Sequence, residues 1–165
     1  MNSIDLIRQN LTASRDRVLA RIEEMREHCF VAPTPQGGAH TLWVLGHLAT
    51  IEGHIIRELM RGEPNPLDHW RALFDGDEVS MTTSDDPGFD EVLDQCQAMR
   101  ADTLTLIDAM TEADLDQSSA VIAPGFEDWF GTARHCLQFV ADHWYMHRGQ
   151  LADARRAAGL ARMGV

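Results

Sequence analysis

Apolar residues recur at helical spacing through four long segments of the chain, and no segment shows the alternation of polar and apolar residues that marks a strand. The spacing predicts helices over residues 4–25, 42–59, 86–110 and 129–158. Turn-rich stretches with proline and glycine separate them. We therefore predict an all-α fold, an antiparallel four-helix bundle with two long connections, in a single domain spanning residues 1–165.

The two long connections carry local signals of their own. The first contains the stretch DHWRALF, which predicts a short helix between the turn motifs EPNP and SDDP. Asp86 followed by Pro87 is a favourable N-cap and first-turn pair, so the third long helix is expected to begin there. The second connection, DQSSAVIAPGFED, leads into the last helix, which is expected to begin near Trp129.

Charge and composition exclude several classes of function. The formal net charge of −12 repels nucleic-acid backbones and anionic lipid, so neither nucleic acid nor membrane is expected as a partner. The N-terminal residues lack an apolar signal segment, and no stretch approaches the roughly 20 apolar residues that span a bilayer, which predicts a cytoplasmic protein. All 14 basic residues are arginine, so no lysine can form a Schiff base or act as a general base.

The three cysteines do not form a recognisable metal or disulfide pattern. Cys29, Cys96 and Cys136 are far apart and never in a C-x-x-C pair. We expect them to be small core residues in a reducing compartment.

The stretch DHWYMHRGQL places two histidines four residues apart in the last predicted helix. His143 and His147 share one helix face, close enough for both imidazoles to bind one ion. His147 also follows the apolar stripe marked by Val140 and Leu151, so it should point into the bundle. A buried imidazole without a partner costs about 1–3 kcal/mol, so metal ligation or hydrogen bonding must satisfy the pair.

The second predicted helix supplies candidates for a third ligand. His40, His47 and His54 are spaced by seven and share nearly the same face, but neighbours in this row are roughly 10 Å apart along the axis, so only one can join the pair. His47 is the best candidate because core-type residues surround it. Three histidines with an open coordination position form a catalytic rather than a structural type of zinc site. Position 144 is Trp144, so the motif of zinc peptidases is absent, and no Glu-x-x-His pair suggests a di-iron site.

These segments together resemble the DinB-like superfamily of metal-binding four-helix bundles. The resemblance rests on TLWVLGHLATIEGHIIREL, on NPL..W..LF and on DHWYMHRGQL. It implies three metal ligands, namely His47, His143 and His147, and a homodimer. Many members carry a further histidine one turn before the pair, where this chain has Phe139. Glu52 and Gln150 are candidates to orient a ligand imidazole, although each is more typical of an ordinary polar helix residue.

The function follows from what the open position can bind. A thiol bound to such an ion loses its proton near neutral pH, and the resemblance implies transferases and isomerases that use low-molecular-weight thiols such as bacillithiol and mycothiol. The leading hypothesis is a metal-dependent S-transferase or detoxification enzyme that uses zinc or nickel, a small-molecule thiol and an electrophile. The alternatives are a metal-dependent hydrolase and a non-catalytic, stress-associated metal-binding bundle.

Overall fold

The structure is a computed structural model that describes residues 2–76, 79 and 87–161. Within these ranges it is all-α, with isolated β-bridges but no strand, as the periodicity predicts. The long helices are α1 (Ser3–Glu24), α2 (Thr41–Gly53), α4 (Phe89–Asp108) and α6 (Ala133–Ala157). The shorter ones are η1 (Arg26–His28), the π-helical η2 (His54–Met60) that continues α2, η3 (Asp68–Trp70), α3 (Arg71–Phe74), η4 (Asp114–Asp116) and α5 (Glu127–Phe130).

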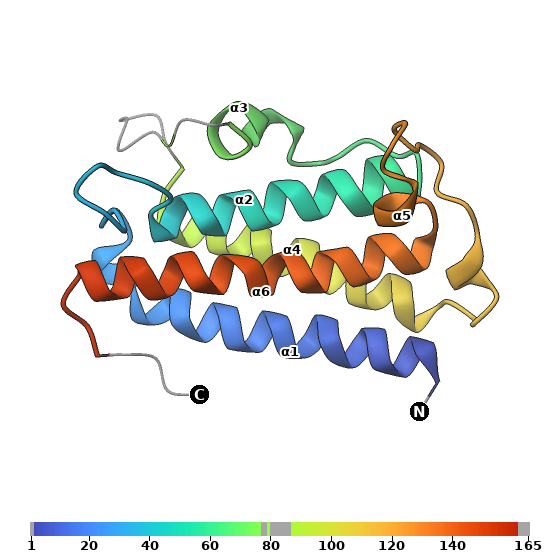
Figure 1. Ribbon diagram of the computed structural model, residues 1–165, viewed down its shortest axis with the longest axis horizontal. Helices are drawn as coiled ribbons and strands as arrows, with labels where there is room; N and C mark the ends of the chain where they lie inside the picture. The colour runs from blue at the N-terminus through green and yellow to red at the C-terminus, as the bar shows by residue number, and fades with distance from the viewer. Residues whose placement is uncertain (1, 77–78, 80–86, 162–165) are drawn as a thin grey trace.

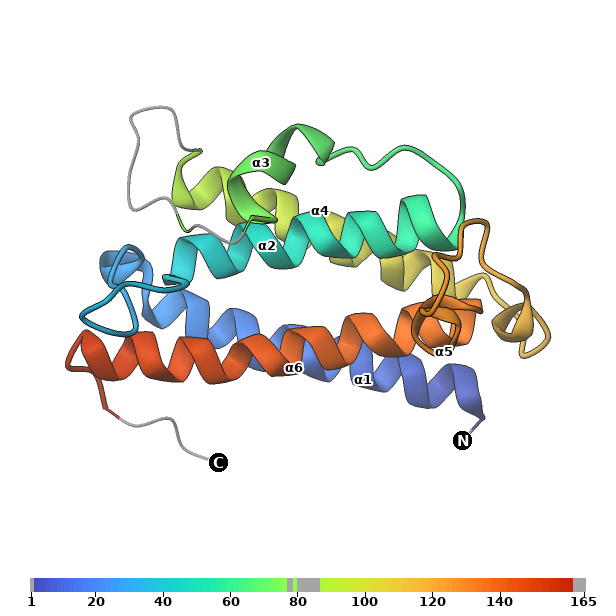
Figure 2. The same cartoon turned by 45° about the horizontal axis from the view of Figure 1, so that its top comes forward.

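The four long helices lie side by side along the length of the molecule (Figure 1). Helices α1 and α6 run in one direction, and α2 and α4 run in the other. The antiparallel arrangement therefore holds for the packed pairs α2/α6 and α1/α4, whereas the pairs α1/α6 and α2/α4 are parallel. The connection that follows η2 makes this possible, because it returns along the outside of α2 and carries α3 with it (Figure 2).

Helix α2 is enclosed on nearly all sides. Every residue of this helix is buried except His47 and Ile51, which are partly exposed. A helix that is apolar all round must be covered all round. The segment that carries η3 and α3 (residues 65–74, called here the α3 segment) covers the side that α4 and α6 leave open. The partial exposure of His47 and Ile51, one turn apart, shows where this cover is incomplete.

A buried ion pair links all four long helices. The Arg100 guanidinium on α4 donates to the Glu52 carboxylate on α2 at 2.8 Å, and the indole of Trp144 on α6 donates to the same carboxylate at 3.0 Å. Arg100 also donates to the carbonyl of Leu11 and the hydroxyl of Ser14 on α1. Because both charges are fully buried, these contacts fix the relative register of the helices.

Several helix boundaries differ from the prediction. Helix α4 begins at Phe89 with Gly88 as its N-cap, so Pro87 lies outside the helix, and Asp86 lies outside the described residues. The last long helix begins at Ala133 rather than near Trp129, because α5 ends at Phe130 with Gly131 as its C-cap. The Thr132 side chain then caps the new helix by accepting from the backbone N–H of His135. The short helix predicted at DHWRALF is present as η3 and α3. No helix in the described part of the chain combines the length and the apolar character needed to cross a membrane.

Candidate metal centre

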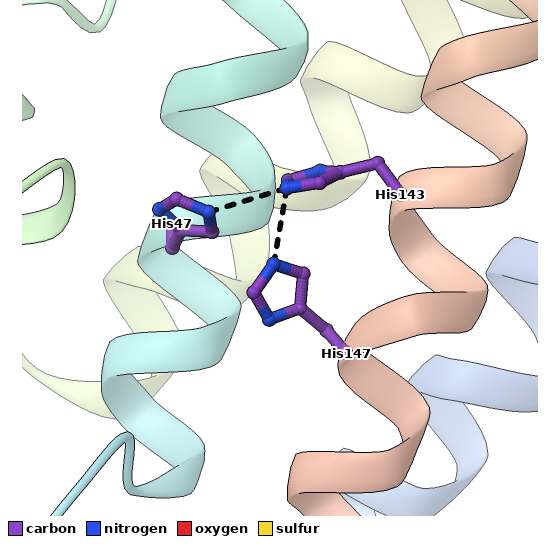
Figure 3. Close-up of side chains that lie close together, drawn as sticks. All are labelled: His47, His143 and His147. Atoms are coloured by element: carbon purple, nitrogen blue, oxygen red, sulfur yellow. Dashed lines mark hydrogen bonds between the residues drawn. The ribbon is translucent and has the colours of Figure 1, made fainter.

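Three imidazoles converge between α2 and α6. His47 extends from α2, and His143 and His147 extend from successive turns of α6, so that their rings point toward one another (Figure 3). Nε2 of His143 lies 3.2 Å from Nε2 of His47 and 3.0 Å from Nε2 of His147. These three residues form the one group of metal-ligand type that the described residues contain. We call them the histidine triad.

The spacing of the triad fits a single ion. Two nitrogen atoms that each lie about 2.1 Å from one ion are separated by about 3.0–3.4 Å when the bond angle is about 90–110°. Both measured Nε2 to Nε2 distances, 3.2 and 3.0 Å, match this separation. All three candidate ligands come from two neighbouring helices, and no fourth residue of metal-ligand type joins the group within the described residues.

Two of the imidazoles are held by hydrogen bonds from their outer nitrogen. Nδ1 of His47 donates to the backbone carbonyl of Phe74 at 2.6 Å, and Nδ1 of His147 donates to Oε1 of Gln150 at 2.6 Å. A neutral imidazole carries one proton, so both rings present the lone pair of Nε2 to the centre of the triad. Outer hydrogen bonds of this kind orient the ligands of metal sites.

The protons available cannot satisfy both contacts inside the triad. If Nε2 of His47 and of His147 are both acceptors, the single Nε2 proton of a neutral His143 can be donated to only one of them. The other pair would bring two lone pairs to about 3 Å. A cation at the centre removes this conflict, and we therefore conclude that the residues present fit a divalent metal ion.

The position of His47 depends on how closely the α3 segment approaches α2. A Cβ atom on Gly46 would lie 2.5 Å from the ring of Phe74, and one on Gly53 would lie 2.2 Å from Oδ1 of Asn65. The Asn65 amide donates to the carbonyl of Thr50 at 3.1 Å. The absence of a side chain at these two glycines, which are seven residues apart, therefore lets Phe74 and Asn65 pack directly against the backbone of α2. This close packing brings the Phe74 carbonyl within hydrogen-bond distance of His47.

Burial keeps the triad neutral at physiological pH. Burial lowers the pKa of His143 to about 3, and the neighbouring imidazoles add to the effect. It lowers the pKa of His147 to about 4, and it lowers that of His47 as well. Since neutral imidazole is the form that binds metal, the triad is ready for an ion without first losing protons.

Aromatic rings form the surroundings of the triad. The Trp43 ring stacks on His47 with centroids 4.6 Å apart, and the Phe139 ring stacks on His143 at 5.7 Å. A pocket of about 170 Å³ adjoins the triad on the Phe139 side. The residues that line this pocket, called here the aromatic pocket, are Asp128, Trp129, His135, Gln138, Phe139, Asp142, His143 and Met146.

The remaining sequence candidates lie outside the triad. His40 caps α2 by accepting from the backbone N–H of Trp43, and His54 pairs with Glu58 on η2. Glu52 pairs with Arg100 on α4, which is the ordinary polar role that the sequence favoured for it. Gln150 instead takes the alternative role, because its side chain accepts from a triad imidazole.

The cysteines mostly follow the prediction of a core role, and two of the tryptophans lie in the core as well. Trp144 and Trp43 are buried, but Trp129 is 57% exposed. Cys96 and Cys136 are buried, and Cys29 is partly so.

The sequence did not predict two structural features, the acceptor of His47 and the buried network of Arg100. The Phe74 carbonyl is a backbone atom, and no residue type marks it, although the glycine directly before His47 is a signal that a neighbour approaches closely. The Arg100 network was missed because a single arginine on an amphipathic helix is ordinarily exposed.

Comparisons with known proteins agree with the family resemblance and with the fold. The family model of the DinB superfamily matches residues 3–151. A solved structure described as a conserved protein from Enterococcus faecalis has 19% sequence identity and a TM-score of 0.63, covering 96% of this chain and 99% of its own. At this identity the likeness shows the fold alone. No curated protein matches the chain. With a family match over most of its length, the chain belongs to the DinB superfamily.

Proposed function

We propose that this protein is a metal-dependent S-transferase that joins a low-molecular-weight thiol to an electrophile. The observation that carries the proposal is the convergence of three Nε2 lone pairs beside an open pocket. When bound, a zinc or nickel ion would lower the pKa of a thiol that coordinates it and so supply a nucleophile at neutral pH. The reaction forms a carbon–sulfur bond while the bond from that carbon to its leaving group breaks. The leaving group departs with the electron pair, and the thiol proton passes to solvent.

The chain's own residues provide binding and orientation. The Phe74 carbonyl and Gln150 hold two of the ligands in the tautomer that metal binding requires. Trp43 and Phe139 cover the outer faces of two ligand rings and limit the access of water to them. The aromatic pocket gives the electrophile a place beside His143.

A hydrolase is less well supported. Water activation by a metal is commonly assisted by a carboxylate that acts as general base. Glu52, the buried carboxylate of α2, already accepts hydrogen bonds from Arg100 and Trp144 and is not free for this role. The carboxylates of the aromatic pocket, Asp128 and Asp142, are both exposed.

The test is conjugation by protein loaded with zinc or with nickel. Glutathione, cysteine, bacillithiol and mycothiol are each offered with a panel of alkyl and aryl electrophiles, and the thioether product is measured by mass spectrometry. We expect at least one pair to react faster than in the absence of protein, with loss of that rate in His143→Ala. The absence of catalysed conjugation for every pair would overturn the proposal, and turnover of ester or amide substrates without thiol would favour the hydrolase.

A further inference from the structure

The aromatic pocket has the size and lining of a site for a single ring. Its volume of about 170 Å³ is close to that of an apolar cavity of about 150 Å³ that can hold benzene. The rings of Trp129 and Phe139 meet edge to face with centroids 5.7 Å apart. Met146, which is 63% exposed, adds a flexible apolar wall at the mouth.

The charges at this pocket select against anions. Two carboxylates, Asp128 and Asp142, and the imidazole of His135 line it, and no arginine does so within the described residues. The side chain of Gln138 donates to Asp142 at 3.0 Å and holds that carboxylate in place. The net charge of the chain, −12, adds to the negative potential at the mouth.

We propose that the aromatic pocket binds a ring-sized apolar group that is uncharged or positively charged, and that it excludes anionic groups of the same size. Apolar contact with Trp129, Phe139 and Met146 supplies the affinity, and a positive charge gains further from the Trp129 ring and the two carboxylates. This inference rests on the proposed function in one respect. It makes this group part of the electrophile, which His143 places next to the metal centre.

The test uses three ring compounds of different charge: benzyltrimethylammonium, benzyl alcohol and benzoate. Binding is measured at pH 8 by ligand-observed NMR titration, once with metal-loaded protein and once with metal-free protein. We expect benzyltrimethylammonium and benzyl alcohol to bind, and benzoate to bind at least about fivefold more weakly than benzyl alcohol. Equal binding of benzoate, or no binding of benzyl alcohol, would overturn the inference.

Two variants locate the binding and its charge preference. Met146→Gln removes about 40 Å² of apolar contact, so it should weaken benzyl alcohol binding about fivefold. Leu6→Gln, which changes an exposed apolar residue of α1, is the matched control and should leave binding unchanged. Asp142→Asn should narrow the difference between benzyl alcohol and benzoate, and an unchanged difference would contradict the role of that carboxylate.

Binding and catalysis fail separately in this design. If benzyl alcohol binds as expected and no thiol is conjugated, the S-transferase proposal fails and the pocket assignment stands. If thiols are conjugated and Met146→Gln changes neither ring binding nor the preference among electrophiles, the pocket assignment fails and the S-transferase proposal stands.

Discussion

Gly46 lies directly against the ring of Phe74, leaving no room for a Cβ atom at position 46. The contact connects a residue without a side chain to the orientation of a triad imidazole, because the backbone carbonyl of Phe74 accepts the Nδ1 proton of His47. Gly46 therefore helps to orient His47 without being part of the triad, because it allows Phe74 to approach α2.

Replacement of Gly46 by alanine is expected to weaken metal binding. The new methyl group would displace Phe74, so His47 would lose its acceptor, and loss of such an outer partner typically costs about 10–100-fold in metal affinity. Gly149→Ala on α6 is the matched control, because a Cβ there meets nothing within 4 Å. Competition with a chromophoric chelator measures both affinities, and equal values would contradict the role given to Phe74.

Each triad histidine is expected to be needed for stoichiometric metal. Elemental analysis of zinc-loaded protein should find about one ion per chain, and His47→Ala, His143→Ala and His147→Ala should each reduce this strongly. His69 is an exposed residue of η3 and lies outside the triad, so His69→Ala is the control that should retain the ion. If wild-type protein stays metal-free after loading, the metal assignment is wrong.

The outer hydrogen bond of Gln150 can be tested by a matched pair of variants. Gln150→Leu removes the acceptor from His147 and should lower zinc affinity by about 10–100-fold, while Gln150→Glu keeps an acceptor and should retain most of it. Circular dichroism should be unchanged in both, since Gln150 is exposed. Comparable affinities for the two variants would show that the hydrogen bond does not orient the ligand.

Metal-free protein is expected to lose stability as the pH falls from 6.5 toward 5. The pKa values of His143 and His147 are about 3 and about 4 in the folded chain, below the ordinary value of 6.5. Within this window the unfolded chain takes up protons that the folded chain does not, so the free energy of unfolding decreases by up to about 1 kcal/mol per histidine for each pH unit. Urea denaturation in the presence of chelator measures this slope, which should become shallower in a His143→Leu, His147→Leu variant.

The buried network of Arg100 is expected to dominate the stability of the bundle. Glu52→Gln leaves the guanidinium buried without a counter-charge, which should lower the free energy of unfolding by about 3–5 kcal/mol. Trp144→Phe removes one hydrogen bond to Glu52 and should cost about 1–3 kcal/mol. Asp108→Asn breaks the exposed pair with Arg8 and serves as the control with the smallest effect. Urea denaturation at pH 7 ranks the three variants.

The fold and the triad were accessible from sequence for a physical reason. Amphipathic periodicity reports which face of a helix is buried, and the rise per residue limits how many histidines of a row can meet one ion, so His47 was separable from His40 and His54. The resemblance to the DinB-like superfamily pointed to the same three residues.

The directions of the helices, the start of α6 and the hydrogen-bond partner of His47 were harder to predict from the sequence. The parallel direction of α2 and α4 depends on the path of a long connection, which periodicity does not encode. The start of α6 at Ala133 was missed because Trp129 continues the apolar pattern across Gly131, and the Thr132 cap was the signal that the pattern concealed. The acceptor of His47 is a main-chain oxygen, which has no sequence signature.

Helix α6 contributes to both the triad and the aromatic pocket. His143 and His147 contribute to the triad, whereas Phe139, Asp142 and Met146 contribute to the pocket. Because these sets share only His143, substitutions at the pocket positions alter which group is recognised without replacing a metal ligand. One helix thus carries two sets of side chains that can be varied almost independently of each other.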